Sequence, residues 1–312
     1  MTLPVICLMG PTAAGKTALA LELAEKFTLD IVSVDSALIY RGMNIGTAKP
    51  TPAILKQFPH HLIDICEPTE SYSAGQFLDD VKKVIASLHQ KNKVPLLVGG
   101  TMLYYRALQQ GLARLPVANK VLRDELDSLR IQYGTSYLHQ KLRQVDPISA
   151  QRIHHHDSQR LQRALEVFMA SGKPLSDFLI EHQPITPYRF INIVISPFQR
   201  HILHSRIASR FSEMMTDGFL EEVRSLFSRE ELSRELPAMR CVGYRQLLGY
   251  CANEYSLDEA INKGIIATRQ MAKRQITWLR SQPDAVWFNS ENGLPINEVT
   301  SYLCDKAPEL ID

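Results

Sequence analysis

Residues 3–17, LPVICLMGPTAAGKT, decide the fold of this chain. Leu3 to Met9 are mostly apolar and partly β-branched, which predicts a strand buried on both faces of a parallel sheet. Gly10 to Thr17 follow at once and match the phosphate-loop pattern G-x-x-x-x-G-K-[ST] at every fixed position. From Leu19 to Phe27 the apolar residues recur at helical spacing. The motif therefore lies between a predicted strand and a predicted helix, the context that a phosphate loop requires.

This motif predicts a site for an anion. Its glycines let the backbone curl so that N–H groups converge, and the following helix adds the positive end of its dipole. Lys16 would bring a cation to a diphosphate or triphosphate, and the Thr17 hydroxyl would bind Mg²⁺. The residues predicted to form the phosphate site are Gly10, Pro11, Thr12, Ala13, Ala14, Gly15, Lys16 and Thr17.

The composition argues against several protein classes. The chain has 312 residues, of which 45% are hydrophobic and 22% charged, as in ordinary globular proteins with room for two domains. No apolar run approaches transmembrane length, so no membrane partner is expected. The five scattered cysteines lack C-x-x-C spacing, which argues against a disulfide framework or a structural zinc and favours the reducing cytoplasm.

The ends of two predicted strands indicate where the acid of the site lies. The strand Asp30–Val34 ends in Asp35-Ser36, and ligands of open α/β sheets gather at the carboxyl ends of strands. The alternative is a turn-forming Asp-Ser pair. The strand Val94–Val98 ends in Gly99-Gly100-Thr101, without the acidic residue usual in motor-type or GTPase-type phosphate-loop proteins. Asp35 is therefore the expected acid.

Further elements follow from apolar periodicity. Strands are expected at His60–Ile65, Arg189–Ser196 and Val286–Phe288. One helix is expected from Ser73, which opens a capping-box pattern, to Gln90. In the C-terminal region, one helix is expected to end at about Asp217, a second to span Phe219–Phe227, and a third to run from Leu257 to about Arg280.

The middle of the chain differs from the rest, because residues 114–183 have a helical pattern that no convincing strand interrupts. We therefore expect an α/β core (1–113), an all-helical insertion (114–186), and the rest of the core with a helical, basic C-terminal region (187–312). The insertion contains His154-His155-His156-Asp157. Consecutive histidines on a helix cannot converge on one ion, which disfavours a metal site.

Positive charge is concentrated in the C-terminal region. The net charge of the chain is +2, whereas the segment 240–282 holds seven Lys and Arg residues against three acids, a local excess of +4. Such an excess is expected either of a surface that binds phosphates or of a solvated helix face.

The residues alone predict a phosphate-loop α/β enzyme with one strand-end carboxylate. A kinase of a small molecule or nucleotide is the first hypothesis, because such a carboxylate can orient or deprotonate an acceptor hydroxyl. The basic region is too extended for a small acceptor alone.

The sequence also resembles bacterial tRNA dimethylallyltransferases (tRNA isopentenyltransferases, the IPP transferase family) over roughly Leu3 to Arg280. Besides the phosphate loop, the resemblance rests on Asp35–Arg41, Gly46–Pro50, Val98–Tyr104, Asp157–Glu166, Arg240–Arg245 and Thr268–Arg280. The first motif is shared with many families, but the set together is specific. It implies a P-loop NTPase-like parallel sheet flanked by helices, with the helical insertion.

The resemblance implies transfer of a dimethylallyl group from its diphosphate to N6 of the adenosine 3′ of the anticodon, in tRNAs that read codons starting with U. The implied catalytic residues are Asp35, Thr101, Lys16 and Thr17, with Mg²⁺ as cofactor near Thr17. The phosphate loop would hold the prenyl diphosphate, and Asp35 would accept a proton or hydrogen bond from the amine. Thr101 could bind either the base or the diphosphate. The sequence departs from the family at Ala14, where Ser is frequent.

The resemblance also implies contacts with the tRNA anticodon stem-loop, whose target base must be extruded from its stack. The implied contact residues are Asp35, Ser36, Ala37, Leu38, Thr101, Arg123, Gln159, Arg160, Leu161, Gln162, Arg163, Arg240, Cys241, Val242, Gly243, Tyr244, Arg245, Lys273, Arg274, Gln275, Ile276, Thr277, Trp278, Leu279 and Arg280. The family further suggests a monomer.

Two alternatives remain open. An ATP-dependent small-molecule kinase fits the phosphate loop and Asp35 taken alone. A non-catalytic RNA-binding protein, whose phosphate loop only senses a ligand, fits the basic region.

Overall fold

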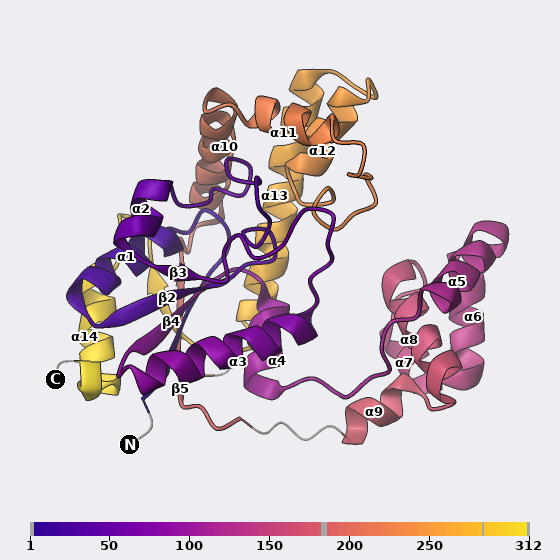
Figure 1. The fold of residues 1–312 in the computed structure, drawn as a ribbon, viewed down its shortest axis with the longest axis horizontal. Coiled ribbons are helices and arrows are strands. Elements are labelled where there is room, and N and C mark those ends of the chain that lie inside the picture. Colours follow the sequence, from indigo (N-terminus) through magenta and orange to yellow (C-terminus); the bar gives the residue numbers. More distant parts are fainter. Residues whose placement is uncertain (1–2, 182–185, 283, 311–312) are drawn as a thin grey trace. The chain divides into compact units, whose positions relative to one another are not determined.

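The computed structural model describes residues 3–181, 186–282 and 284–310, and its centre is a parallel sheet (Figure 1). The strand order is β3-β2-β4-β1-β5-β6, and every neighbouring pair is parallel. The strands are β1 (Val5–Met9), β2 (Leu29–Val34), β3 (His60–His61), β4 (Val94–Gly99), β5 (Phe190–Ser196) and β6 (Val286–Asn289). All carboxyl ends therefore meet at one edge, where the phosphate loop and Asp35 follow β1 and β2.

Helices cover both faces of the sheet, because alternate residues of a strand point to opposite sides. Ile6 and Leu8 belong to a core with α1 (Lys16–Lys26) and α14 (Ile296–Lys306). Val5, Cys7 and Met9 belong to a second core with α3 (Ala74–Gln90) and α4 (Met102–Gln110). The capping box predicted for α3 is confirmed, since Ser73 and Gln76 bond reciprocally. The prediction of a parallel sheet flanked by helices is thus confirmed.

Four C-terminal helices form a third core together with the loop after β2. They are α10 (Arg200–Thr216), α11 (Phe219–Phe227), α12 (Tyr244–Cys251) and α13 (Leu257–Leu279). Ile39, Tyr40 and Met43 of the loop pack among their apolar side chains, which include Phe211 and Phe219. This packing holds the loop after β2 against α10–α13, which lie far later in the chain.

The helical insertion is a compact unit, Gln109–Thr186, separate from the unit formed by Met1–Leu108 and Pro187–Asp312. Its helices are α5 (Lys120–Tyr133), α6 (Thr135–Val145), α7 (Pro147–Arg152), α8 (Ser158–Ser171) and α9 (Leu175–Glu181). It has its own core, which includes Leu126, Leu138 and Leu161. Buried Asp146 joins two of the helices, because its carboxylate accepts from the backbone N–H groups of Ser149 and Ser176.

The structure corrects one predicted strand. Only His60 and His61 of the segment 60–65 pair with β2. Leu62 and Asp64 have φ angles of 62° and 53°, which an extended strand cannot contain. The strand prediction was therefore wrong beyond His61, because apolar character alone does not distinguish a turn from a strand.

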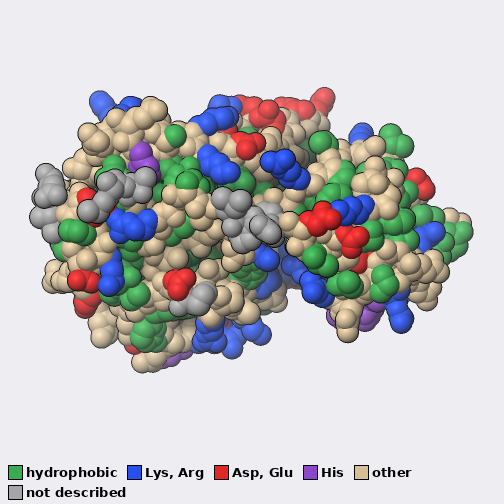
Figure 2. All heavy atoms as spheres, turned by 90° about the horizontal axis from the view of Figure 1, so that it is seen from below, with side chains coloured by type: hydrophobic (Ala, Val, Ile, Leu, Met, Phe, Trp, Pro, Cys, Tyr) green, Lys and Arg blue, Asp and Glu red, His purple; other side chains and the backbone are tan. Residues whose placement is uncertain are grey.

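Among the described residues, four α-helices were not predicted from the sequence: α4, α12, α14 and the short α2 (Pro52–Gln57). Among the described residues, no helix combines the length and apolar character needed to cross a membrane. Charged side chains of both signs are interspersed on the face shown in Figure 2, consistent with a net charge of only +2.

Candidate active site

The phosphate loop turns sharply between β1 and α1. Gly15, the last residue before α1, has a φ of 97°, and Ala13 has a φ of 61°. The loop also passes close to β5, because a Cβ on Gly10 would lie 2.4 Å from the backbone oxygen of Ile195. Glycine is therefore required at position 10 by close approach and at position 15 by backbone conformation.

Two cations line the cavity beside this loop. The Lys16 ammonium donates to the backbone oxygens of Gly10 and Pro11, at 3.0 and 2.7 Å. Burial, and next the nearby charge of Arg210, lower the pKa of Lys16 to about 7, although Asp35 acts in the opposite direction. Burial likewise lowers the pKa of Arg210, which lies on α10. In the described part of the chain, neither cation forms an ion pair with a carboxylate, although the charge of Asp35 acts on both from a greater distance. An anion in this cavity could therefore contact both cations without displacing a carboxylate.

Arg210 was not among the residues predicted from the sequence. No motif signals it, because an arginine on an amphipathic helix is most often a surface residue. Only the packing of α10 brings it to the cavity.

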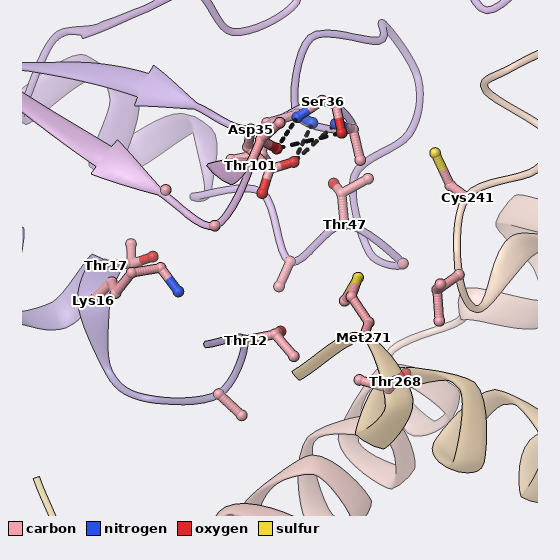
Figure 3. Close-up of a pocket in the computed structure, with 18 of the residues that line it drawn as sticks. Thr12, Lys16, Thr17, Asp35, Ser36, Thr47, Thr101, Cys241, Thr268 and Met271 are labelled. Atoms are coloured by element: carbon pink, nitrogen blue, oxygen red, sulfur yellow. Dashed lines mark hydrogen bonds between the residues drawn. The ribbon is translucent and has the colours of Figure 1, made fainter. Parts of the chain in front are cut away.

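The carboxyl ends of β2 and β4 are joined by hydrogen bonds (Figure 3). Asp35 Oδ1 accepts from the backbone N–H groups of Ala37 and Leu38, at 2.8 and 3.3 Å. Thr101 Oγ1 accepts from Ser36 N at 3.0 Å. Asp35 therefore stabilises the turn after β2 and also lines the cavity. Its other oxygen, Oδ2, accepts no hydrogen bond from the described residues and remains available to a ligand.

Gln275 of α13 braces the phosphate loop against the end of β4. Its Oε1 accepts from Thr12 N, and its Nε2 donates to the Gly100 backbone oxygen, both at 2.9 Å. The sequence predicted Gln275 as an RNA contact. Here both polar groups of the side-chain amide are used within the protein.

These elements enclose a cavity of about 1110 Å³. Figure 3 shows Thr12, Lys16 and Thr17 on one side and Cys241 with Thr268 and Met271 on another. Of the residues predicted as site residues, the cavity is lined by Thr12–Thr17, Asp35–Leu38, Thr101, Arg240–Tyr244, Arg274, Gln275 and Trp278. A predicted anion site, a carboxylate and a basic segment therefore meet in one place.

Comparison with known proteins identifies the family. The model of the IPP transferase family matches residues 38–282. This chain belongs to the IPP transferase family. It is 52% identical over 288 residues to a tRNA dimethylallyltransferase of Legionella pneumophila (strain Corby), covering 92% of each chain. It is 49% identical over 300 residues to a tRNA dimethylallyltransferase of Coxiella burnetii (strain Dugway 5J108-111), covering 96% of each.

A solved structure agrees with this assignment. The crystal structure of the full-length tRNA isopentenylpyrophosphate transferase from Bacillus halodurans superimposes with a TM-score of 0.72 at 32% identity. The match covers 99% of this chain and 97% of that one. The fold and family membership predicted from the sequence are thus confirmed.

Some residues that the family resemblance marked as RNA contacts have buried side chains. Leu279 is fully buried beneath the sheet, and Tyr244 is buried against Phe219. In contrast, Arg245, Lys273, Arg274, Thr277 and Arg280 are exposed. The exposed members are the ones whose side chains can reach a polyanion in this conformation.

In the insertion, two residues marked as RNA contacts are paired internally. The side chain of Glu166 is fully buried and accepts from Arg123 Nε at 2.9 Å and from Arg163 at 2.6 Å. Burial favours the protonated form of Glu166, but these arginines and the Asn119 backbone N–H hold its pKa below the usual value. Arg123 and Arg163 therefore share one carboxylate within the fold of the insertion.

The other residues marked in the insertion divide by exposure. Leu161 is buried in the core of the insertion, and Gln162 donates to the Arg123 backbone oxygen at 3.2 Å. Gln159 and Arg160 are exposed, and Arg160 Nε forms an ion pair with Asp157 Oδ2 at 3.5 Å. Gln159 and Arg160 are thus the members whose side chains are best placed to meet solvent or RNA.

The donor set for a divalent metal is small. Among the described residues, no three His, Cys, Asp or Glu side chains gather to hold an ion. The Thr17 hydroxyl lines the cavity, and within the described residues it has no hydrogen-bond partner. One hydroxyl beside a phosphate loop fits Mg²⁺, which is usually held by few protein ligands together with substrate phosphates and water.

Proposed function

We propose that this protein transfers a dimethylallyl group from dimethylallyl diphosphate to N6 of the adenosine 3′ of the anticodon, in tRNAs that read codons starting with U. One observation carries the proposal. A single cavity is lined by a phosphate loop, by the carboxylate of Asp35, and by two cations, Lys16 and Arg210, that form no ion pair with a carboxylate of the described residues. The names of the family relatives support the same reaction.

The phosphate loop would stabilise the leaving group. As the bond between the allylic carbon and oxygen breaks, negative charge develops on the diphosphate. The backbone N–H groups of Ala13 and of residues 15–17 would meet this charge, as would the side chains of Lys16 and Arg210. Because the charge is larger in the transition state than in the bound substrate, these contacts lower the activation barrier.

Asp35 would act on the nucleophile. The exocyclic amine of adenosine forms the new bond to the allylic carbon, and one of its protons must leave. The Oδ2 atom of Asp35 can accept a hydrogen bond from that amine and then its proton, while the turn to Ala37 and Leu38 holds Oδ1. Since an aryl amine is weakly basic, its positioning matters as much as proton removal.

Thr17 would hold Mg²⁺ together with oxygens of the diphosphate. The ion would add positive charge beside the leaving group when bound. The Thr17 hydroxyl supports this role because it lines the cavity next to Lys16 and has no protein partner among the described residues.

We propose that the RNA bound is the anticodon stem-loop. Arg240, Arg274 and Trp278 line the cavity, and Lys273 and Arg280 are exposed on and just after α13. Extruding the target base costs a few kcal/mol, which contacts to the loop backbone and splayed bases would offset. Thr101 would bind either the base or the diphosphate. We further propose that the enzyme acts as a cytoplasmic monomer.

The test is transfer of label from radioactive dimethylallyl diphosphate to a synthetic, unmodified anticodon stem-loop in the presence of Mg²⁺. The control stem-loop carries guanosine in place of the target adenosine. Labelling of the adenosine stem-loop alone is expected. Absence of transfer, together with phosphate transfer from ATP to a small acceptor, would favour a kinase and contradict the proposal.

A further inference from the structure

One carboxylate outside the cavity holds two of its walls together. Glu222 of α11 accepts hydrogen bonds from three successive backbone N–H groups, those of Asn44, Ile45 and Gly46, at 2.8, 2.9 and 3.1 Å. It also accepts from the hydroxyl of Tyr244, at 2.5 Å. Few side chains satisfy four donors, and these come from the loop after β2 and from α12.

The packing around Glu222 leaves little freedom for the loop. A Cβ on Gly46 would lie 2.0 Å from the ring of Phe219 and 2.7 Å from that of Tyr244, so the loop rests directly on both rings. The two rings pack edge to face, with their centroids 5.0 Å apart. Gly46 and the following Thr47 line the cavity, as do Phe219 and Tyr244.

The donors at this contact are arranged to suit a carboxylate. Three converging backbone N–H groups form an anion-binding concavity. Burial, and next the charge of Glu222, raise the pKa of Tyr244, which keeps its hydroxyl protonated as a donor. Glu222 itself does not line the cavity, so it acts on a ligand only through the segments that it holds.

We infer that Glu222 is a positioning residue that fixes the loop 44–48 and Tyr244 as the RNA-facing wall of the cavity, an inference that rests on the proposed function. The phosphate loop is held separately, by Gln275, so diphosphate binding does not depend on Glu222. The loop also has a second attachment. The buried ammonium of Lys49 donates to the Tyr40 backbone oxygen and to Asp64.

The test compares Glu222→Gln with Glu221→Gln, the adjacent, exposed glutamate whose ion pair with Arg224 is 3.7 Å long. In Glu222→Gln the shape is kept, but the charge is lost and an NH₂ group faces backbone donors. Affinity is measured by fluorescence anisotropy of a labelled anticodon stem-loop and by calorimetric titration with inorganic diphosphate.

We expect Glu222→Gln to weaken stem-loop binding about tenfold or more while diphosphate affinity stays within about twofold of wild type. Glu221→Gln should match wild type in both measurements. Tyr244→Phe, which removes one of the four hydrogen bonds, should weaken stem-loop binding about threefold. Glu222→Asp, which keeps the charge on a shorter side chain, should lie between wild type and Glu222→Gln.

Unchanged stem-loop affinity in Glu222→Gln would overturn the inference. So would an equal loss of stem-loop and diphosphate affinity, because this is the result expected of general structural damage. If Glu222→Gln does not fold, the decision passes to Glu222→Asp and Tyr244→Phe, and wild-type affinity in both would overturn the inference. Wild-type protein that binds diphosphate but no stem-loop would instead contradict the proposed function.

Discussion

The cations of the cavity and those of the helical insertion differ in whether they contact a carboxylate. Lys16 and Arg210 lie beside the phosphate loop without a carboxylate in ion-pair contact among the described residues, and burial lowers the pKa of each. Arg123 and Arg163 of the insertion share the fully buried carboxylate of Glu166. The first pair is available to an anionic ligand, whereas the second pair stabilises the fold of the insertion.

This difference shows that an arginine within a family motif need not belong to the binding site, and that a binding-site arginine need not lie in a motif. Arg163 lies in a recognisable segment, yet its guanidinium bonds to Glu166 and to the Pro116 backbone oxygen. Arg210 lies in no segment that the sequence marks, yet it faces the cavity. For the arginines, burial beside the cavity without an ion-pair partner among the described residues is a better sign of a ligand-binding cation than membership of a family motif.

The largest effect is expected on the rate of transfer, when the carboxylate of Asp35 is replaced. Asp35→Asn keeps an Oδ1 that can accept from Ala37 and Leu38, so the turn should persist, but the amide cannot take a proton. We expect single-turnover transfer to fall by roughly 10²–10⁴-fold. Asp217→Asn, at an exposed aspartate after α10, is the control. A rate within threefold of wild type in Asp35→Asn would remove Asp35 from the chemistry.

The next effect concerns the brace of the phosphate loop. Gln275→Glu replaces the NH₂ group that donates to the Gly100 oxygen with a negatively charged oxygen, beside the loop that would hold a diphosphate. We expect the KM for dimethylallyl diphosphate to rise about tenfold. Gln270→Glu, at an exposed position of the same helix, is the control. Equal KM values in the two variants would show that Gln275 does not support the phosphate loop.

A third prediction concerns pH. Because the pKa of Lys16 in the free protein is lowered to about 7, its ammonium loses the proton as pH rises above that value. A diphosphate binds the protonated form, so its affinity should fall by up to about tenfold per pH unit above pH 7. Lys16→Met corrects for ionisation of the diphosphate itself. If wild type and Lys16→Met have parallel pH profiles in calorimetric titrations, Lys16 does not control this binding.

The smallest effect on RNA binding is expected in the insertion. Since the Arg163 guanidinium is already held by Glu166 and by the Pro116 backbone oxygen, Arg163→Met should change stem-loop affinity by less than about threefold. The loss should appear in stability, with the free energy of unfolding reduced by about 1–3 kcal/mol. Thermal unfolding and anisotropy measure the two quantities. A large loss of RNA affinity without a loss of stability would make Arg163 a direct RNA contact.

Local signals explain what the sequence could predict. The phosphate loop, the capped helix α3 and the buried strands β1, β2, β4 and β5 each depend on residues close in the chain. The strand predicted over residues 60–65 was wrong beyond His61, because apolar character does not reveal the positive φ angles of Leu62 and Asp64.

The parts that the sequence did not reveal depend on contacts between distant residues. Glu222 and Asn44 are 178 positions apart, and Gln275 and Thr12 are 263 apart. No periodicity or spacing relates such positions. Arg210 is a third example, since its role follows from how α10 packs beside the phosphate loop.

The proposed diphosphate site depends on Lys16 and Arg210, two cations that form no ion pair with a carboxylate in the described part of the chain. Its most direct test is calorimetric titration of wild type, Arg210→Met and Arg163→Met with inorganic diphosphate in the presence of Mg²⁺. We expect wild type and Arg163→Met to bind with the same affinity and Arg210→Met to bind about tenfold or more weakly. Equal affinity in all three proteins, each shown to be folded, would contradict it.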